Sequence, residues 1–169
     1  IACYSRLMEA DEEGTFAALH ECRRVLDRYS GEHGGRIFSS AGDSVVAEFS
    51  SPVEAVRCAL DVRDELGRLN ESRPADRHVE LRIGINLGDV IVEGDDIYGD
   101  GVNVAARLEP LAEPGGVCIS GIVNDSVARR VGVAFGDAGE VQVKNIDRPI
   151  RVWKWHPAHD AASQPGSAG

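Results

Sequence analysis

Lysine is almost absent from this chain of 169 residues, because only Lys144 and Lys154 occur among its 18 basic residues. Long apolar runs are also missing, since no stretch approaches the roughly 18 apolar residues that a membrane-spanning helix needs. No secretory signal peptide is recognisable at the start of the sequence. These absences predict a soluble, cytoplasmic domain that makes no direct contact with a membrane.

Paired cysteines are a further absence. The four cysteines are widely separated and form no C-x-x-C motif, which argues against a zinc ribbon or a redox pair. Reduced thiols are the simplest interpretation. The five histidines show no metal-ligand spacing, and we assign them no chemical role. These residues are Cys3, Cys22, Cys58 and Cys118, and His20, His33, His78, His156 and His159.

The chain also lacks positive charge, with a formal net charge of −10. A surface that binds nucleic acid needs a basic stripe, so nucleic acid is excluded as a partner. A nucleotide site is not excluded, because one local lysine and one arginine are enough to hold a phosphate group. The length and the 43% share of hydrophobic residues fit one domain with a substantial core.

Hydrophobic periodicity predicts strands and helices that alternate along the chain. Helices are expected over residues 10–29, 52–69, 102–111 and 121–131. Strands are expected at residues 1–4, 36–38, 45–49, 79–85, 117–120, 134–143 and 150–155. Residues 89–93 should pair with the strand 79–85 across a turn at Leu87-Gly88. Ser51 and Glu54 predict a capping box at the start of the second helix.

This order of elements indicates an α+β domain. We expect a ferredoxin-like core with additions, in which a mixed and mainly antiparallel sheet is flanked by helices that cover one of its faces. The domain should extend over residues 1–156. Residues 157–169 are small and polar, which is typical of a flexible linker or tail. The sequence begins inside an apolar stretch without Met, so we expect it to be part of a longer chain.

Asp43 lies at the expected tip of the hairpin between residues 36 and 49. A carboxylate in this place is suited to Mg²⁺, because hard divalent cations prefer oxygen ligands. Gly-Asp is also ordinary turn chemistry, and the local pattern alone favours that alternative. A site for two metal ions would need a second carboxylate nearby.

Asn103 and Arg107 are four residues apart in the predicted helix and therefore share one helix face. Arginine offers a planar donor fork that matches phosphate oxygens, and asparagine offers both a donor and an acceptor. The alternative is a solvated polar face. The preceding loop contains Gly94, Gly99 and Gly101, which would allow backbone to approach a ligand closely.

Together these residues resemble the catalytic domain of class III adenylate and guanylate cyclases, of the bacterial type. The resemblance covers nearly the whole chain, and its most specific part is an Asp and a Gly followed by V-N-x-x-x-R. The matching stretches are YSRLM (4–8), GGRI (34–37), AGDSVVAEF (41–49), LRIGINLGDV (81–90), GDDIYGDGVNVAARLE (94–109), LAEPGG (111–116) and VKNIDRPIRV (143–152).

The resemblance implies a role for each matching position. Asp43 matches a metal-binding aspartate, and two Mg²⁺ or Mn²⁺ ions are implied at each site. Asn103 matches the asparagine that orients the ribose, and Arg107 matches the arginine that stabilises charge on the reacting phosphate. Lys144 matches a lysine that contacts the triphosphate, and Asp96 matches one of two residues that recognise the purine. Without the resemblance, Lys144 alone reads as a surface lysine.

The resemblance also implies a homodimer with its active sites at the interface. The metal ligands come from one protomer, and the asparagine and arginine come from its partner. Two positions depart from the family pattern. The second metal aspartate would fall immediately before Ile1, outside this sequence, and Ser39 replaces the lysine that is the other purine-recognising residue. The resemblance therefore does not settle the choice between ATP and GTP.

We expect a nucleotidyl cyclase that converts ATP to 3′,5′-cyclic AMP and pyrophosphate and serves as the signalling output of a longer chain. The alternative is a catalytically silent cyclase-homology module that binds a nucleotide or only dimerises. Ser39 motivates this alternative.

Overall fold

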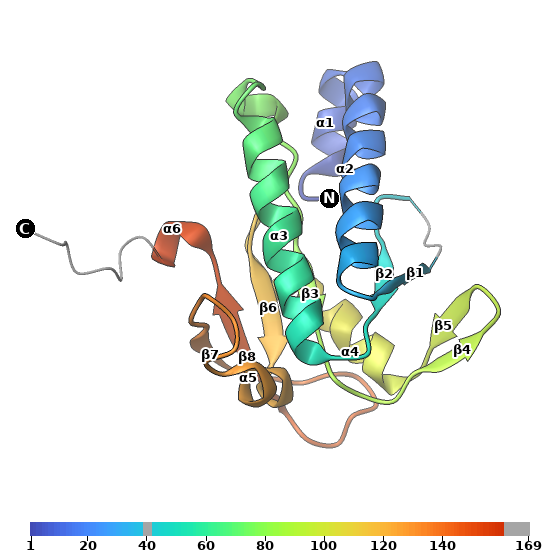
Figure 1. Cartoon of the computed structure of the whole chain (residues 1–169), viewed down its shortest axis with the longest axis vertical. Coiled ribbons are helices and arrows are strands. Elements are labelled where there is room, and N and C mark those ends of the chain that lie inside the picture. Colours follow the sequence, from blue (N-terminus) through green and yellow to red (C-terminus); the bar gives the residue numbers. More distant parts are fainter. Residues whose placement is uncertain (39–41, 161–169) are drawn as a thin grey trace, which may run out of the picture.

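The computed structural model describes residues 1–38 and 42–160, and Figure 1 shows how their helices and strands are arranged. The helices are α1 (Tyr4–Ala10), α2 (Glu12–Glu32), α3 (Pro52–Asn70), α4 (Asp100–Leu108), α5 (Gly121–Val127) and α6 (Pro157–Asp160), with short 3₁₀ turns η1 (Ala75–Arg77) and η2 (Glu109–Leu111). The strands are β1 (Arg36–Phe38), β2 (Val46–Glu48), β3 (Ile83–Ile85), β4 (Ile91–Glu93), β5 (Asp96–Tyr98), β6 (Val117–Ser120), β7 (Gly136–Val141) and β8 (Ile150–Trp155). This mixture confirms the predicted α+β class.

A four-stranded sheet in the order β3-β6-β8-β7 forms the centre of the fold. β6 is parallel to β3 and antiparallel to β8, and β8 is antiparallel to β7. Two further strand pairs, β1-β2 and β4-β5, are antiparallel ribbons. The mixed, mainly antiparallel arrangement is the one predicted, and β1-β2 confirms the hairpin expected around Asp43.

The predicted pairing of residues 89–93 with the strand before them is wrong. β4 pairs with β5 instead, and Glu93 lies opposite Asp96 across the two-residue loop Gly94-Asp95. Gly94 has a φ of 59°, which the first position of such a tight hairpin loop requires. Because β4 pairs with β5, it does not pair with β3. β3 pairs in parallel with β6.

Several predicted boundaries also differ from the structure. Residues 1–4 do not form a strand. The Ala2 N–H donates to the Glu80 carbonyl oxygen at 2.8 Å and the Ile1 nitrogen donates to the Asp43 carbonyl oxygen at 3.0 Å, after which the chain enters α1. The Ser51 side chain makes no capping hydrogen bond, so the capping box is wrong. Residues 157–160 form α6 where we expected a linker to begin. β3 and α5 are both shorter than predicted.

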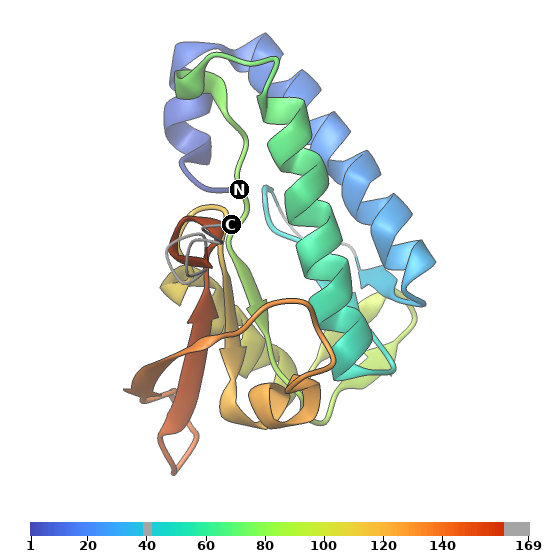
Figure 2. The same cartoon turned by 60° about the vertical axis from the view of Figure 1, so that its left-hand side comes forward.

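Helices α2 and α3 run side by side, as Figure 2 shows. Cys22 and Val25 of α2 pack with Cys58, Val62 and Leu66 of α3 in one buried cluster. These are the two longest described helices, with 21 and 19 residues. No helix in the described part of the chain is long and apolar enough to cross a bilayer.

His33, just after α2, adds a polar clamp between these two helices. Its Nδ1 lies 2.7 Å from Glu54 Oε2, and its Nε2 lies 2.7 Å from Asp61 Oδ2, both on α3. Burial opposes the charging of His33, but the hydrogen bonds to the two carboxylates outweigh it and raise the pKa of the imidazole.

β6 is buried along its whole length. Val117 and Ile119 pack into the cluster formed with α3 and α5, whereas Cys118 packs with Val104 and Leu108 of α4. Because successive side chains of a strand point to opposite faces, helices cover both faces of the sheet at β6. The expectation that helices cover a single face is therefore wrong.

Candidate active site

Asn103 and Arg107 lie on α4, as their spacing predicts, and both are exposed. Their neighbours Val104 and Leu108 are only 4% and 0% exposed. These two apolar side chains belong to a cluster that includes Cys118 of β6. Apolar packing against the sheet therefore fixes the rotation of α4 and leaves Asn103 and Arg107 on its accessible side.

The glycines around α4 permit close contacts within the protein. Gly99 has a φ of 126°, which favours glycine. A Cβ atom on Gly101 would lie 2.8 Å from the carbonyl oxygen of Asp89, and a Cβ atom on Gly84 would lie 2.5 Å from the backbone nitrogen of Glu109. We expected Gly99 and Gly101 to admit a ligand. Among the described residues, both glycines bring α4 against the loop that follows β3, and the close approach of a ligand stays a prediction.

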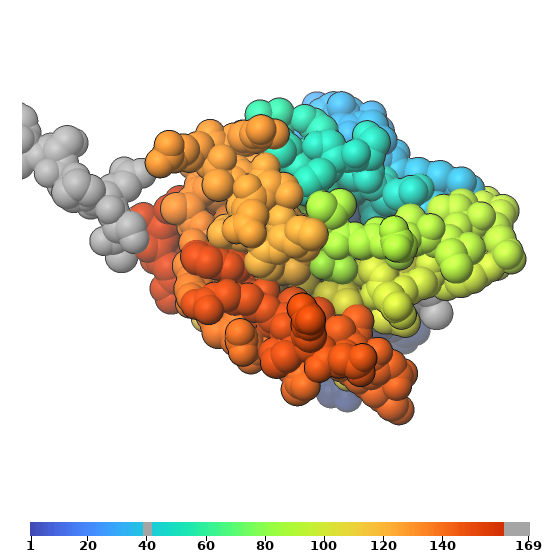
Figure 3. Space-filling view, turned by 90° about the horizontal axis from the view of Figure 1, so that it is seen from below, coloured from blue at the N-terminus to red at the C-terminus, as the bar shows by residue number. Residues whose placement is uncertain are grey.

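Lys144 lies just after β7 and is exposed. The preceding residue, Val143, is 5% exposed and packs in the same cluster as Val104 and Leu108 of α4. Burial of Val143 thus anchors this segment beside α4 and leaves Lys144 at the surface. Seen from below in Figure 3, α4 lies between the segment after β7 and the β4-β5 ribbon.

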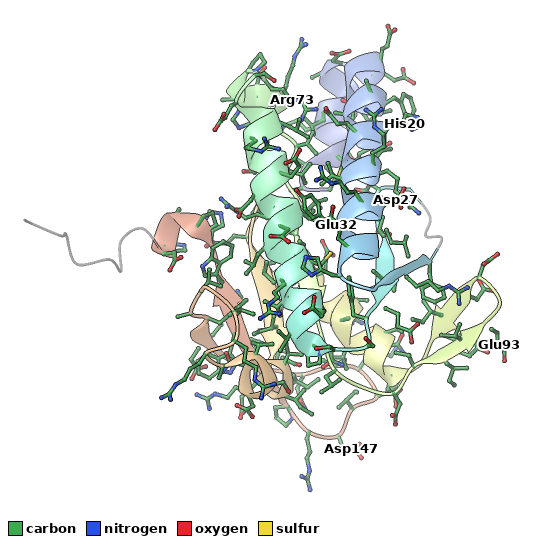
Figure 4. All side chains as sticks on the ribbon, viewed as in Figure 1. His20, Asp27, Glu32, Arg73, Glu93 and Asp147 are labelled. Carbon is green, nitrogen blue, oxygen red and sulfur yellow. The ribbon has the colours of Figure 1, made fainter. Side chains whose placement is uncertain are left out.

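Asp96 is the first residue of β5 and is exposed near the tip of the β4-β5 ribbon. In Figure 4, its cross-strand partner Glu93 projects away from the ribbon. Arg36 of β1 donates a hydrogen bond of 2.5 Å to the Gly94 carbonyl oxygen, which places β1 beside this tip. Ser39, which directly follows β1, lies outside the described residues.

Asp43 lies between β1 and β2 and is partly buried. Its Oδ2 is 3.5 Å from the amino nitrogen of Ile1, and its carbonyl oxygen accepts a hydrogen bond of 3.0 Å from the same nitrogen. A residue joined to Ile1 would therefore lie next to Asp43. Its accessible carboxylate suits a hard divalent cation, but within the described residues it belongs to no cluster of three or more potential metal ligands.

The side chains of Asn103, Arg107 and Lys144 form no hydrogen bond or ion pair within residues 1–38 and 42–160. Asp43 contacts none of them there. The side chains of Arg107, Lys144 and Asn103 therefore lie on or near α4 with their hydrogen-bond donors free within these residues. The predicted metal ligand, Asp43, lies on a separate hairpin.

A cleft of about 810 Å³ opens beside the start of α4. It is lined by Asp89, Asp100 and Asp125, and its one arginine, Arg151, is ion-paired with Asp137. Three carboxylates repel a triphosphate. None of the predicted site residues lines this cleft, so we do not place a nucleotide there.

Arg82 is a candidate functional residue that our sequence interpretation missed. It precedes β3, and its Nε atom is buried without a hydrogen-bond partner in the described part of the chain. Leu81 packs into the α2–α3 cluster, so alternation places Arg82 and Glu80 on the opposite face. Because Arg82 occupies a polar position of this alternating strand, the pattern alone does not set it apart.

All four cysteines are free, as expected. Burial raises the pKa of Cys22, Cys58 and Cys118 to about 11. Such thiols are protonated at neutral pH, so they are poor nucleophiles.

Comparisons with known proteins agree with the fold. The profile of the adenylate and guanylate cyclase catalytic domain family matches residues 6–155. The chain is 46% identical over 166 residues to the "Putative adenylate cyclase 3" of Rhizobium meliloti (strain 1021), which covers 98% of this chain. It spans only 28% of the length of that relative. It also spans 30% of the length of an uncharacterized Mycobacterium tuberculosis protein that is 32% identical over 123 residues.

Two solved structures show the same architecture. An adenylate/guanylate cyclase/hydrolase from Silicibacter pomeroyi matches with a TM-score of 0.86 and 44% identity, over 92% of this chain and 91% of that chain. The adenylyl cyclase CyaB from P. aeruginosa matches in fold with a TM-score of 0.75 and 24% identity, over 90% of this chain and 88% of that chain. The chain belongs to the adenylate and guanylate cyclase catalytic domain family.

Proposed function

We propose that this domain converts ATP to 3′,5′-cyclic AMP and pyrophosphate. The observation that carries the proposal is the surface around α4, where Asn103, Arg107 and Lys144 are exposed without a protein partner among the described residues. In a chain with a net charge of −10, exposed cationic side chains on two segments that pack together suit a polyanionic ligand.

In the proposed reaction, the ribose 3′-hydroxyl attacks the α-phosphate in line. The new O–P bond closes the ring, the hydroxyl proton is released, and the bond to the pyrophosphate leaving group breaks. Asn103 orients the ribose, and Arg107 stabilises the negative charge that builds up on the α-phosphate. Lys144 holds the leaving phosphates.

Asp43 would hold the catalytic Mg²⁺ or Mn²⁺, two ions being expected at each site. A bound divalent ion lowers the pKa of an attacking hydroxyl and neutralises phosphate charge. The position of the Ile1 amino nitrogen, 3.5 Å from Asp43 Oδ2, supports a second ligand from the residue before Ile1. We expect an aspartate at that position.

The active site is completed by a second copy of the chain. The β4-β5 ribbon and the loop before it carry exposed apolar side chains, with Ile91 51% exposed, Leu87 43% and Tyr98 41%. A two-stranded ribbon that displays such residues gains stability when a partner covers it. In the homodimer, Asp43 of one protomer faces Asn103 and Arg107 of the other.

The choice of base depends on Asp96 and Ser39. Arg36 holds the start of β1 against the turn before Asp96, and Ser39 matches the other purine-recognising position of the family. We favour ATP because the Rhizobium meliloti relative carries the name of an adenylate cyclase. A serine hydroxyl still hydrogen-bonds a purine, although it lacks the reach and charge of lysine.

The chain spans 28% of the length of that relative, and we propose that the domain is the output unit of a longer cytoplasmic protein. Its substrate, ATP, is found in the cytoplasm.

The test is a cyclase assay on the protein extended by an aspartate before Ile1, with Mg²⁺ or Mn²⁺, supplied with ATP and then with GTP. We expect cyclic AMP at protein concentrations that support dimers, and a loss of about 10²–10³-fold in kcat for Arg107→Ala. Arg24→Ala, which removes an exposed arginine on α2, is the matched control. If no cyclic nucleotide forms at high protein concentration, the proposal fails.

A second candidate is a silent module that binds a nucleotide or only dimerises, and Ser39 in place of the family's lysine favours it. Such a module would bind ATP or self-associate without turnover. Its regulatory output would survive Arg107→Ala, whereas the output of a cyclase would not.

A further inference from the structure

Glu113, His156 and His159 come together on the side of the molecule away from the β4-β5 ribbon. Glu113 lies in the turn before β6, and the two histidines flank the start of α6. In Figure 1, α6 and the ribbon are at opposite sides of the domain. This cluster is therefore separate from the proposed nucleotide site.

The geometry of the cluster fits a metal centre. One potential ligand atom from each of the three side chains lies within 4.8 Å of the other two. His159 Nε2 is 3.1 Å from Glu113 Oε2. Two ligands on a tetrahedral zinc ion, each about 2.0–2.1 Å from the metal, are separated by roughly 3.3 Å.

The turn beneath the cluster favours close approach of its ligands. Gly115 has a φ of 81°, and a Cβ atom on it would lie 3.6 Å from both His156 Nε2 and Glu80 Oε1. A Cβ atom on Gly116 would lie 3.3 Å from His156 Cδ2. Two glycines thus leave space around the His156 ring.

We propose that Glu113, His156 and His159 form a site for a divalent transition metal, with Zn²⁺ as its best-suited ion. Imidazole and carboxylate ligands suit Zn²⁺, and three protein ligands leave a fourth position for water. The sequence interpretation gave these histidines no role, because their carboxylate partner is far away in the chain and only the fold brings it close.

Binding of a metal replaces existing hydrogen bonds. His156 Nε2 lies 2.9 Å from the Pro114 carbonyl oxygen, and its Nδ1 accepts the Ala158 N–H at 3.1 Å. Coordination through Nε2 moves the ring proton to Nδ1 and gives up both contacts. The net contribution of each hydrogen bond is small beside the affinity of zinc for three protein ligands. The metal would tie α6 to the turn before β6.

Calorimetric titration of the full chain with ZnCl₂ tests this site. An excess of Mg²⁺ occupies oxygen-ligand sites such as that of Asp43. Wild-type protein is compared with His159→Ala and Glu113→Gln. His20→Ala is the matched control, because His20 projects from α2 away from the cluster (Figure 4). Titration with Co²⁺ provides a second readout, since a tetrahedral centre absorbs strongly in the visible range.

We expect one zinc ion per chain in the wild type and in His20→Ala, and an affinity at least about tenfold weaker in the two cluster variants. His159 and Glu113 have exposed side chains, so both variants should fold, and zinc should raise the Tm of the wild type but not of the variants. Equal zinc binding by all four proteins, or no binding by the wild type, would overturn the proposal. A loss of binding in His20→Ala would overturn it as well.

Discussion

The guanidinium of Arg36 donates to the carbonyl oxygen of Gly94, and the same group lies 3.5 Å from Asp95 Oδ1. This contact joins β1 to the β4-β5 turn, although the two residues are 58 positions apart in the chain. Asp96, which we propose to read the base, begins β5 just after this turn.

Removal of this contact should affect substrate binding more than chemistry. We expect Arg36→Ala to raise the KM for ATP by roughly fivefold, the effect of losing about one hydrogen bond that positions the base site. The kcat should change little. Steady-state kinetics on the N-terminally extended protein provide the measurement, and Arg23→Ala, which breaks an exposed ion pair on α2, is the control. A fall in kcat at constant KM would contradict the assigned role.

The proposed dimer predicts that two inactive variants rescue one another. Asp43→Asn removes the metal ligand, and Arg107→Ala removes the partner's cation. An equal mixture forms about one half mixed dimers, and each mixed dimer has one intact site of its two, so about a quarter of wild-type activity should return. Cyclic AMP production after mixing, compared with each variant alone, measures this. Activity that stays at the level of the separate variants would show that each site is built within one chain.

Gly84 should be essential for the seating of α4 on the sheet. A Cβ atom there would lie 2.5 Å from the Glu109 nitrogen and 2.6 Å from the Ala105 carbonyl oxygen. Both are backbone atoms that cannot rotate away, so we expect Gly84→Ala to destabilise the protein by about 1–3 kcal/mol.

Gly67→Ala is the matched control for this substitution. A Cβ atom on Gly67, within α3, meets nothing within 4 Å, so this change should leave stability unchanged or raise it by up to about 1 kcal/mol. Urea unfolding measures both variants. Equal stability of the two would show that the approach of α4 to β3 is not tight.

The His33 clamp predicts a pH-dependent stability. Its hydrogen bonds to Glu54 and Asp61 raise the pKa of His33 against the effect of burial. The folded state therefore binds the proton more tightly, so this stabilisation is complete below the pKa of the unfolded state and is lost as pH rises through the folded pKa. The same hydrogen bond, together with Arg57, lowers the pKa of Glu54. The Glu54 contribution is present above its unfolded pKa and is lost as pH falls.

The measurement is the free energy of unfolding as a function of pH for the wild type and His33→Gln. We expect the advantage of the wild type to be about 1 kcal/mol near pH 6, where His33 is charged, and to shrink towards pH 9. His20→Gln should follow the wild type at every pH. A difference that is constant with pH would mean that His33 acts through packing alone.

The local patterns predicted where several residues of the proposed site lie in the fold. The four-residue spacing of Asn103 and Arg107 placed both on the exposed side of α4, because the apolar positions between them had a single way to be buried. Lys144 is exposed for a similar reason, because the neighbouring side chain of Val143 is buried. The predicted pairing partner of residues 89–93 was wrong. Turns were possible at Leu87-Gly88 and at Gly94-Asp95, and the second one forms and pairs β4 with β5.

The remaining features depend on contacts between distant parts of the chain. No local pattern reveals that Gly84 faces the backbone of α4, that Arg36 reaches Gly94, or that Glu113 meets His159. The parallel pairing of β3 and β6 is likewise a long-range choice. In each of these cases the sequence shows the residue type but not the distant residue that it contacts.

The exposed apolar ribbon of β4 and β5 has a consequence for regulation. In the proposed assembly, single chains are idle, so at low concentration the rate of product formation rises with the square of the amount of protein. Any neighbouring segment that brings two copies together, or holds them apart, would then switch the output steeply without touching a catalytic residue.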